Sequence, residues 1–529
     1  MRRSNWAAVA LLAITLAVPA GAAAGPAQTR LTVHADRPGS TINKNIYSQF
    51  SEHLGSGIYG GIYVGEGSSI PNTRGIRNDV VAALKELKVP MVRWPGGCFA
   101  DEYHWRDGLG PKDKRTVRIN TNWGGVPDGN EFGTHEFFDF VEQIGADAYV
   151  NANVGTGSPA EAAQWLEYMT GGQDTTLVKE RKANGRDKPW KVAVYAMGNE
   201  TWGCGGNMRP QYYADQYNRY STFMKTAQNP PPVMLASGDR DGSATDFTSE
   251  LMKNRRTRMD AISMHYYTTL GPTWFNKDTA TGFNEAGWIR VLANTLKMDG
   301  YIKKHDQIMT ATEKKAAASP NGPKGKVGLY IDEWGTWYKP EPGSNPGFLV
   351  QQNTIRDAIV AAANFNIFHK HADRVQMTSI AQTVNVLQAM VLTDGPRMLL
   401  TPTYHVFHMY KPFQEATSLP LDIKTARYAY GKMNVPQVSA SAARTKEGTI
   451  VIGLANLSPH RAAPISAAIT GIHGGQVTGE ILTADVMDAH NTFESPNTVH
   501  PVAFEGATLR GNKLVTKLPP MSVVVQTIQ

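Results

Sequence analysis

Two glutamates stand at the ends of apolar runs in this sequence. Glu200 closes VAVYAMGNE (192–200), Glu333 lies near the end of VGLYIDEWG (327–335), and a tryptophan follows each within two residues. A carboxylate at the edge of a core needs a partner or a chemical task. Two carboxyl groups about 5–5.5 Å apart can cleave a glycosidic bond with retention, because one protonates the leaving oxygen and the other attacks the anomeric carbon. Pairing of both glutamates with basic residues is the purely structural alternative.

This chemistry requires elements that bring both glutamates to one place. Mostly apolar runs predict eight strands, at 46–54, 90–97, 147–155, 192–200, 232–238, 259–267, 327–335 and 374–382. Amphipathic segments with helix signals lie between several of them, at 78–88 (with an Asn cap), 158–169 (with a Ser cap), 211–227, 287–305 and 355–371. The alternation predicts an α/β fold, a (β/α)8 TIM barrel, whose active site lies at the carboxyl ends of the strands.

The barrel would place the two glutamates opposite each other. Glu200 ends the fourth predicted strand and Glu333 the seventh. Successive residues of a strand face opposite ways, so we expect that Asp332 and Glu333 do not both point into the barrel mouth.

A change in the pattern of apolar residues divides the chain into domains. After about residue 400, alternating apolar residues and turn residues replace the helical pattern, which predicts an antiparallel β-sandwich of jelly-roll type over 399–529. The barrel is predicted over 46–398. The segment 25–45 contains an isolated strand, TRLTVHAD (29–36), which needs a sheet and is expected to join the sandwich.

Composition and charge exclude several classes of function. The net charge is +7 and the pI about 9.1, but the basic residues are scattered, so we expect no nucleic-acid partner. Residues 1–24 combine two arginines, a short apolar run and small residues, which predicts a signal peptide and a secreted or periplasmic protein, free of the membrane after cleavage. No metal-ligand cluster or phosphate-binding loop is evident, so we expect no metal and no cofactor.

Several longer blocks carry a resemblance to a known family. The sequence resembles the glycoside hydrolase family 51 α-L-arabinofuranosidases over nearly all of the chain after residue 24. The resemblance rests on FSEHLGSGIYGGIYVG (50–65), VRWPGGCFADEYHWRDGLGP (92–111), NEFGTHEF (130–137), GNETWGCGG (198–206), IDEWGTWY (331–338), IAQTVNVLQ (380–388) and DAHNTFESPNTVHP (488–501). GNE alone is a weak signal, but the blocks in this order are specific.

The resemblance implies a role for each matching residue. Glu200 would be the acid/base and Glu333 the nucleophile. Substrate-binding roles fall on a set of side chains that would grip sugar hydroxyls, hold the nucleophile ionised or wall the pocket: Glu52, Arg93, Cys98, Asn199, Tyr267, Trp337 and Gln382. Arg93 also fits an ion pair in a barrel layer, and Trp337 also fits a core position. His265 is expected to orient a neighbour, and His53 to be structural.

The two cysteines leave one question open. Some family members have asparagine where this chain has Cys98, after WPGG, so a side-chain amide contact to the sugar would be lost and a backbone contact kept. Cys98 and Cys204 follow the second and fourth predicted strands. A disulfide between these loops and two free thiols are both compatible with the sequence, because the Cα separation cannot be read from it.

The resemblance therefore implies a retaining, exo-acting α-L-arabinofuranosidase. Its substrates would be arabinan, arabinoxylan or their oligosaccharides. Members of the family are often oligomeric, so the resemblance is also compatible with a homo-oligomer. One alternative is an endo-β-1,4-glucanase or a xylan-active glycosidase on the same fold. A second is a carbohydrate-binding module or solute receptor, against which the intact pair Glu200 and Glu333 argues, since a receptor needs no acid and nucleophile.

Overall fold

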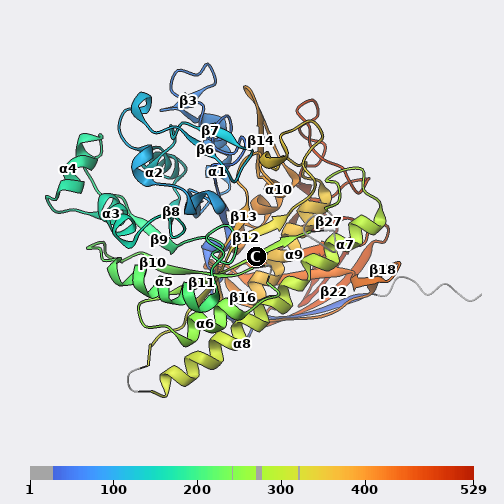
Figure 1. The fold of residues 1–529 in the computed structure, drawn as a ribbon. Coiled ribbons are helices and arrows are strands. Elements are labelled where there is room, and N and C mark those ends of the chain that lie inside the picture. The colour runs from blue at the N-terminus through green and yellow to red at the C-terminus, as the bar shows by residue number, and fades with distance from the viewer. Residues whose placement is uncertain (1–27, 241, 270–276, 320–321) are drawn as a thin grey trace, which may run out of the picture.

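Eight parallel strands close into a barrel at the centre of the molecule (Figure 1). The computed structural model describes residues 28–240, 242–269, 277–319 and 322–529, so the predicted signal peptide (1–24) lies outside the described residues. The predicted barrel is confirmed, and its strands in chain order are β2 (Ser48–Phe50), β5 (Met91–Trp94), β8 (Asp147–Ala152), β9 (Val192–Met197), β10 (Val233–Asp239), β11 (Ala261–Thr268), β12 (Gly328–Thr336) and β13 (Val375–Ala381).

Helices cover the outside of the barrel. They are α1 (Asn78–Glu86), α2 (Thr134–Ile144), α3 (Pro159–Thr170), α4 (Thr176–Ala183), α5 (Pro210–Phe223), α6 (Asp246–Lys253), α7 (Glu285–Thr295), α8 (Lys297–Ala317), α9 (Ile355–Lys370) and α10 (Pro402–Met409). The hydroxyl of Ser158 caps α3 by accepting from the Glu161 amide at 3.2 Å, as predicted. The predicted Asn cap of α1 is wrong, because Arg77 is the cap residue and Asn78 is already helical.

The segment predicted as one helix over 287–305 is two helices. Leu296 ends α7 and precedes the first residue of α8, and α8 then runs to Ala317. Both helices present an apolar stripe, so periodicity alone did not reveal the break between them. The junction matters for function because it lies at the rim of the cavity described below.

An irregularity in β12 changes which side chains enter the barrel. The pairing with β11 joins Ser263 to Tyr330 and then His265 to Glu333, so β12 carries one extra residue. Such a bulge breaks the strict alternation of side chains. Asp332 and Glu333 therefore both contact groups inside the barrel, with Asp332 accepting a hydrogen bond from the Tyr149 hydroxyl at 2.6 Å. Only Glu333 lines the cavity at the barrel mouth, as expected, whereas Asp332 is buried inside the barrel.

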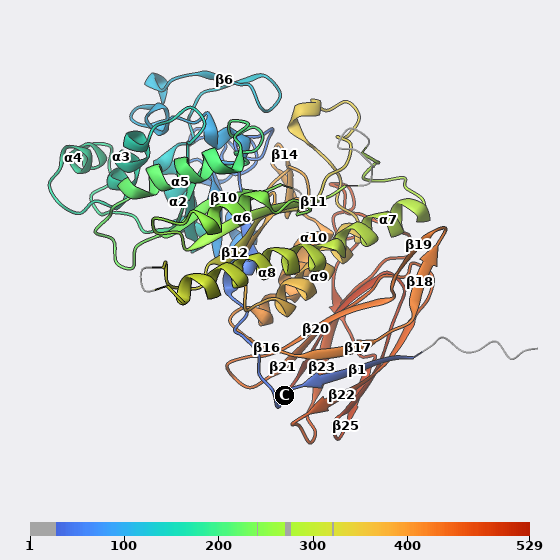
Figure 2. The same cartoon turned by 60° about the horizontal axis from the view of Figure 1, so that its bottom comes forward.

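The C-terminal part consists of two further sheets (Figure 2). One has the order β17-β1-β22-β26-β25 and the other β16-β20-β21-β27-β23-β24. Their strands are β1 (Thr29–His34), β16 (Thr417–Leu419), β17 (Leu421–Lys424), β20 (Val438–Arg444), β21 (Ile450–Asn456), β22 (Ala463–Thr470), β23 (Val477–Leu482), β24 (Val502–Ala503), β25 (Ala507–Arg510), β26 (Lys513–Leu518) and β27 (Ser522–Ile528). Apart from the parallel pair β1 and β22, neighbouring strands run antiparallel.

Apolar side chains from both of these sheets share one core. Leu31 and Val33 of β1 pack there with Ile452 of β21 and Val524 of β27. The first described strand thus lies beside strands more than 380 residues later in the chain, as the blue ribbon among the orange ones shows (Figure 2).

Four hairpins, with strands of two to four residues each, complete the described part of the fold. They are β3 (Asn72–Thr73) with β4 (Ile76–Arg77), β6 (Arg118–Asn120) with β7 (Val126–Asp128), β14 (Val391–Asp394) with β15 (Arg397–Leu400), and β18 (Arg427–Tyr430) with β19 (Met433–Pro436). Within the described part of the chain, no helix has the length and apolar character that crossing a bilayer requires.

Candidate active site

A cavity of about 1090 Å³ opens at the carboxyl ends of the barrel strands. Most of the side chains predicted to form the site line it: Glu52, Cys98, Asn199, Glu200, Tyr267, Glu333, Trp337 and Gln382. Arg93 does not line the cavity but lies beneath it, with its side chain 1% exposed. Residues that are far apart in the sequence therefore meet in one place, as the parallel barrel requires.

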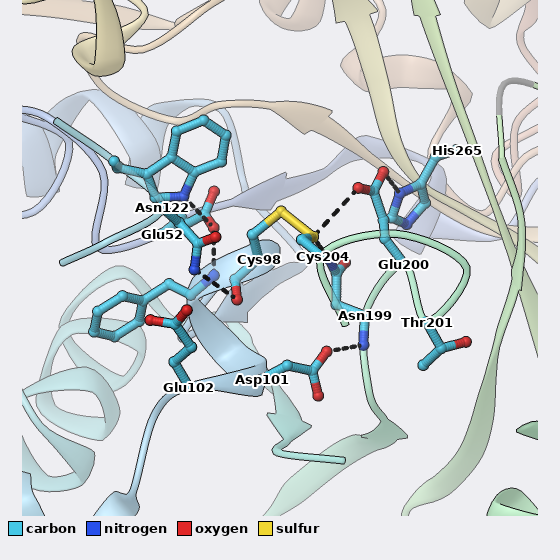
Figure 3. Close-up of a disulfide and its surroundings, with 12 residues drawn as sticks. Glu52, Cys98, Asp101, Glu102, Asn122, Asn199, Glu200, Thr201, Cys204 and His265 are labelled. Atoms are coloured by element: carbon cyan, nitrogen blue, oxygen red, sulfur yellow. Dashed lines mark hydrogen bonds and ion pairs between the residues drawn. A yellow bond between two sulfur atoms is a disulfide. The ribbon is translucent and has the colours of Figure 1, made fainter. Parts of the chain in front are cut away.

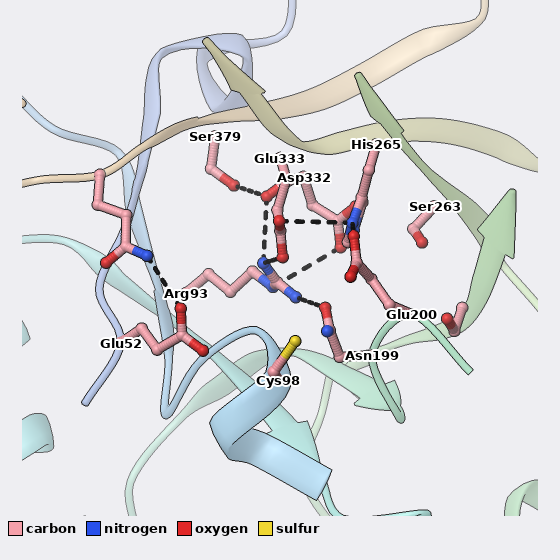
Figure 4. Close-up of polar contacts among 12 residues, drawn as sticks. Glu52, Arg93, Cys98, Asn199, Glu200, Ser263, His265, Asp332, Glu333 and Ser379 are labelled. Carbon is pink, nitrogen blue, oxygen red and sulfur yellow. Dashed lines mark hydrogen bonds and ion pairs between the residues drawn. The ribbon is translucent and has the colours of Figure 1, made fainter. Parts of the chain in front are cut away.

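Glu200 and Glu333 face each other in this cavity (Figure 4). One carboxylate oxygen of each lies within 4.8 Å of the other. The Glu200 side chain is 17% exposed and the Glu333 side chain 6%, so both are enclosed and Glu200 is the more accessible. The short separation fits a direct attack on the anomeric carbon better than an attack by an intervening water, which needs about 6.5–9.5 Å.

Two donors hold the Glu333 carboxylate. The Arg93 guanidinium donates to Oε1 at 2.7 Å, and the Tyr267 hydroxyl donates to Oε2 at 2.8 Å. Arg93 also donates to the side-chain oxygen of Asn199 at 2.6 Å, which fixes the amide orientation. A charge-assisted hydrogen bond of this kind is short and fixes the position of the carboxylate. The ion-pair interpretation of Arg93 is thus correct, and its partner is the predicted nucleophile.

His265 on β11 joins three carboxylates. Its Nδ1 lies 2.9 Å from Glu200 and 3.5 Å from Glu333, and its Nε2 lies 3.2 Å from Asp332. Burial lowers the pKa of His265, but the neighbouring carboxylates outweigh it and raise the pKa to about 10. Glu200, His265 and Glu333 also offer one ligand atom each within 4.8 Å, a spacing that a metal ion could bridge.

The environment of Glu200 favours its protonated form. Burial raises the pKa of Glu200, the hydrogen bond from His265 lowers it, and the Glu333 charge raises it again, with a net upward shift. The chain reaches this position through left-handed backbone at Gly198, with φ +79°, and at Glu200 itself, with φ +40°. The glycine adopts that conformation without strain, which explains the residue type after the apolar run of β9.

Asp101 holds the same loop from below. Its carboxylate accepts from the backbone N–H of Asn199 at 2.8 Å, of Val154 at 2.7 Å and of Gly155 at 2.9 Å. Burial raises the pKa of Asp101 to about 7. The carboxylate therefore connects the loop that carries Glu200 to the loop after β8.

Glu52 lies at the opposite wall. It accepts from the indole N–H of Trp123 at 2.8 Å, from the Gln382 amide at 3.0 Å and from the Phe99 backbone at 3.1 Å. Burial, followed by the Glu333 charge, raises the pKa of Glu52 to about 7. A Cβ on Gly97 would lie 2.7 Å from the carboxylate, so the PGG sequence leaves the space that Glu52 occupies.

Two further predicted residues, Trp337 and Gln382, line the cavity. The ring of Trp337 meets the ring of Tyr267 edge to face, with centroids 4.9 Å apart. The side-chain oxygen of Gln382 is buried and has no partner among the described residues, which leaves an acceptor for a sugar hydroxyl. His53 is structural, as predicted, since it stacks on Phe99 and bonds Asp128 at 2.8 Å away from the cavity.

Cys98 and Cys204 form a disulfide at the cavity wall (Figure 3). Their Cα atoms are 5.5 Å apart, which settles the question that the sequence left open. The Cys204 sulfur lies 3.6 Å from a Glu200 oxygen and 3.8 Å from the Asn199 amide nitrogen. The bridge therefore ties the loop after β5 to the loop that carries Glu200, and the Cys98 side chain is committed to it.

Titration of thiols tests the bridge. The denatured, unreduced protein is expected to show no free thiol with Ellman's reagent. Replacing both cysteines by serine should lower the free energy of unfolding by about 2–5 kcal/mol, because the bridge spans 106 residues of chain. Denaturant unfolding of the Cys98→Ser, Cys204→Ser variant measures this loss. Two titratable thiols per chain in the unreduced protein would contradict the disulfide.

The sequence did not reveal every residue that shapes this site. Asp101 and Trp123 were not singled out, and the contacts of Asp332 with Arg93 and His265 were not predicted. Asp101 lies within the WPGGCFADEYHW block, and the presence of an acid in that block was the signal that could have been followed. Trp123 lies in a loop of mixed composition, and nothing in the sequence links it to Glu52.

Comparison with known proteins agrees with the geometry. Residues 83–284 match the model of the α-L-arabinofuranosidase 1 domain, and residues 332–522 match the model of the α-L-arabinofuranosidase C-terminal domain. A protein of Bacteroides ovatus, the intracellular exo-α-L-arabinofuranosidase, is 46% identical over 94% of this chain and 95% of its own.

The chain belongs to the GH51 α-L-arabinofuranosidase family.

Solved structures extend the likeness to three dimensions. The GH51 arabinofuranosidase of Xanthomonas axonopodis pv. citri is 50% identical, with a TM-score of 0.92 over 95% of this chain and 100% of that one. The α-L-arabinofuranosidase of Thermotoga maritima, solved as an arabinose complex, is 28% identical, with a TM-score of 0.81 over 94% of this chain and 99% of that one. This arabinofuranosidase is therefore a glycoside hydrolase, and the alternative of a binding module or receptor is wrong.

One prediction from the sequence is overturned by these comparisons. The expectation of a secreted or periplasmic protein is wrong, because the Bacteroides ovatus relative, which matches nearly the whole of this arabinofuranosidase, is an intracellular enzyme. The prediction rested on the local composition of residues 1–24, which lie outside the described residues. A short apolar run after two arginines is a compositional signal only, and nothing in the barrel or its site depends on it.

Proposed function

We propose that this exo-α-L-arabinofuranosidase releases terminal arabinofuranosyl residues by double displacement with retention. Glu333 is the nucleophile and Glu200 the acid/base. The observation that carries the proposal is the environment of the pair: Arg93 and Tyr267 donate to Glu333, burial raises the pKa of Glu200, and one oxygen of each carboxyl group lies within 4.8 Å of the other. A carboxylate held by two donors is suited to attack, and a carboxyl group whose pKa is raised by burial is suited to donate a proton.

The first step forms a covalent intermediate. A Glu333 oxygen attacks C1 of the arabinofuranosyl unit, the bond from C1 to the leaving oxygen breaks, and Glu200 gives its proton to that oxygen. Asn199 is proposed to bond the 2-hydroxyl, a contact that strengthens in the transition state, and its hydrogen bond from Arg93 at 2.6 Å supports this role by fixing the amide. Glu52 and Gln382 offer acceptors to other hydroxyls of the sugar.

The second step regenerates the enzyme. The Glu200 carboxylate takes a proton from a water molecule, the water oxygen attacks C1, and the ester bond to Glu333 breaks. Glu200 ends protonated and Glu333 ends ionised, as they began. The arabinose leaves with its original configuration because C1 has been inverted twice.

Stereochemistry tests this proposal. In methanol–water mixtures with an aryl α-L-arabinofuranoside, the first methyl glycoside formed is expected to be the α-furanoside, as followed by proton NMR. A β-furanoside formed first would mean single displacement and would contradict the mechanism.

The substrates proposed are arabinan, arabinoxylan and the oligosaccharides derived from them. The enclosed positions of Glu200 and Glu333 favour a single terminal sugar over a long backbone. A panel of an aryl α-L-arabinofuranoside, an aryl β-xyloside and carboxymethylcellulose compares this function with the backbone-cleaving alternative. Faster hydrolysis of the last two would favour the alternative.

His265 is proposed as a positioning residue for Glu200. Its contact at 2.9 Å lowers the pKa of Glu200, so its removal should raise that pKa. The first step needs protonated Glu200, and the alkaline limb of the kcat/KM profile of His265→Gln should therefore move to higher pH. A His408→Gln variant removes an imidazole from α10, outside the cavity, and should keep the wild-type profile. A limb that stays in place, or moves to lower pH, would contradict this role.

A further inference from the structure

The cavity continues well beyond the two catalytic carboxylates. Its lining includes Arg240, Arg290, Asn294, Lys297 and Tyr301, which we call the outer lobe. Arg240 directly follows β10, Arg290 and Asn294 lie on α7, and Lys297 begins α8. The break between α7 and α8 thus lies at the edge of this lobe, and none of its five residues takes part in the proposed mechanism.

Charge is distributed unevenly along the cavity. Among the lining residues that the structure describes, the acidic ones are Glu52, Glu200 and Glu333, all at the catalytic end. The outer lobe instead contributes the cations Arg240, Arg290 and Lys297. Cations gathered on one wall of a cleft raise the local concentration of anionic groups.

Two of these cations are available to a ligand. Within the described parts of the chain, neither Arg240 nor Lys297 has a carboxylate within ion-pair distance, and both are exposed. Elsewhere on the same helix, Lys303 is paired with Asp299 at 2.6 Å. Lys303 is therefore neutralised by an acidic partner, whereas Lys297 on the same helix has no such partner among the described residues.

The rest of the lobe is ordered by the protein itself. The backbone carbonyl of Asn294 accepts from the Tyr266 hydroxyl at 2.7 Å, and its side-chain amide donates to the Thr269 carbonyl at 2.7 Å. The rings of Tyr266 and Tyr301 meet edge to face, with centroids 4.9 Å apart. The lobe consequently has a fixed polar and aromatic wall, of the kind that receives a sugar ring.

The order of the barrel strands indicates which part of the substrate reaches the lobe. Around the barrel, β9, which leads to Glu200, is followed by β10 and β11, whereas Glu52 and Gln382 follow β2 and β13 on the other side of β12. Arg240 therefore lies one strand from Glu200, a step of about 4.8 Å between strands. The terminal sugar occupies the side of Glu52 and Gln382, and the leaving group lies on the side of the acid/base Glu200.

We propose that the outer lobe binds an anionic group of the leaving portion of the substrate, a uronic acid carboxylate on the oligosaccharide from which arabinose is removed. The inference rests on the proposed function, since it assigns the side of Glu200 to the leaving group. A carboxylate accepts from both Arg and Lys, and the Arg guanidinium can bind it through two parallel bonds. The enzyme would then prefer acidic branched oligosaccharides over neutral ones.

Matched pairs of substrates test this inference. Each acidic oligosaccharide is assayed beside its carboxyl-reduced form, so that only the charge differs. One pair is a xylo-oligosaccharide with an arabinofuranosyl and a glucuronosyl branch, and the other is an arabinofuranosyl oligosaccharide with galacturonosyl units. The wild type is expected to show about 5-fold higher kcat/KM for the acidic member of at least one pair at low ionic strength. The pair whose acidic member is hydrolysed faster identifies the uronic acid, glucuronosyl or galacturonosyl, that the outer lobe binds.

Variants locate the preference. In Arg240→Gln, Lys297→Gln the ratio of acidic to reduced substrate should fall close to one, and 0.5 M NaCl should lower the wild-type ratio in the same direction. The control Lys314→Gln removes one charge from the same helix about 25 Å away and should keep the wild-type ratio.

Failure of this inference is distinct from failure of the proposed function. Equal turnover of acidic and reduced members in both pairs, with an aryl arabinofuranoside still cleaved, would overturn the outer lobe alone. A preference that survives in the double variant would also overturn it. Absence of turnover with every arabinofuranoside would instead count against the proposed function.

Discussion

Replacing Glu333 by alanine is expected to lower the hydrolysis of every arabinofuranoside together, by at least about 10⁴-fold in kcat. The variant lacks the oxygen that attacks C1, so no property of the leaving group can compensate. Dinitrophenyl, p-nitrophenyl and oligosaccharide substrates should therefore lose rate alike. Initial rates on these three classes measure the effect.

Azide should give the Glu333 variant a distinctive product. The small anion can occupy the space of the missing carboxylate and attack C1 once, which inverts the configuration and yields the β-L-arabinofuranosyl azide. Proton NMR distinguishes this product from the α-azide. Formation of the α-azide would mean that Glu333 acts as the acid/base and that the two roles are exchanged.

Folding of the Glu333 variant needs its own control. Loss of the carboxylate removes the partner of the buried Arg93 at 2.7 Å and leaves its charge with only the longer ion pair to Asp332 at 3.8 Å, which is destabilising. Glu333→Gln keeps the volume and an acceptor oxygen for Arg93, and it should be as inactive as Glu333→Ala while unfolding closer to the wild-type denaturant concentration. Glu447→Ala, which removes an exposed carboxylate between β20 and β21, should keep full activity. Activity in Glu333→Gln comparable to wild type would contradict the nucleophile assignment.

Most of the barrel and the core of the site could be predicted from the sequence. Parallel strands buried on both faces read as apolar runs, and their ends carry the chemistry, so Glu200 and Glu333 were found from the residues alone. Roles for Glu52, Arg93 and Gln382 came from the family resemblance, because nothing in their local sequence indicates that they meet. The structure brings Glu52, Glu200, Glu333 and Gln382 to the wall of one cavity, with Arg93 beneath Glu333.

The misses have identifiable physical causes. Asp332 enters the barrel because β12 carries one extra residue, and a bulge leaves no mark in an apolar pattern. The break at Leu296 separates two helices that both look amphipathic. Asp101 acts on three backbone N–H groups of loops distant in sequence, a contact that no spacing rule detects. Long-range polar contacts and local irregularities thus could not be predicted from the sequence, whereas the periodic burial of strands and helices could.

Replacing Glu200 by alanine is expected to lower the rate in a way that depends on the leaving group. Glu200 supplies a proton in the first step and removes one in the second, so both steps lose general acid–base catalysis worth about 10²–10⁴-fold. A dinitrophenolate needs no proton to leave, and its release in the first turnover should remain close to wild type. Oligosaccharides need that proton, and their kcat/KM should fall by the full factor.

The pH profile of the Glu200 variant should change as well. In the wild type the raised pKa of Glu200, caused by burial and by the Glu333 charge, keeps the acid protonated into a higher pH range than an exposed glutamate allows. Rates on oligosaccharides fall once pH exceeds that pKa. The variant has no such group, so its kcat/KM for the dinitrophenyl substrate should not show that fall. If kcat/KM of the variant still falls at high pH, the titrating group that causes the fall is a residue other than Glu200.

Azide should then restore turnover in the Glu200 variant. With the dinitrophenyl substrate, the intermediate on Glu333 accumulates because water lacks its base, and a burst of dinitrophenolate precedes a slow steady state. Azide needs no deprotonation, so it attacks the intermediate, raises the steady-state rate and yields the α-L-arabinofuranosyl azide after a second inversion. Glu102→Ala, a loss of one carboxylate bonded to Thr121 and outside the cavity lining, should show neither burst nor rescue. Equal losses on all leaving groups in Glu200→Ala, with no azide product, would remove Glu200 from the chemistry, and the pair of oxygens within 4.8 Å would then be only an interaction that shapes the cavity.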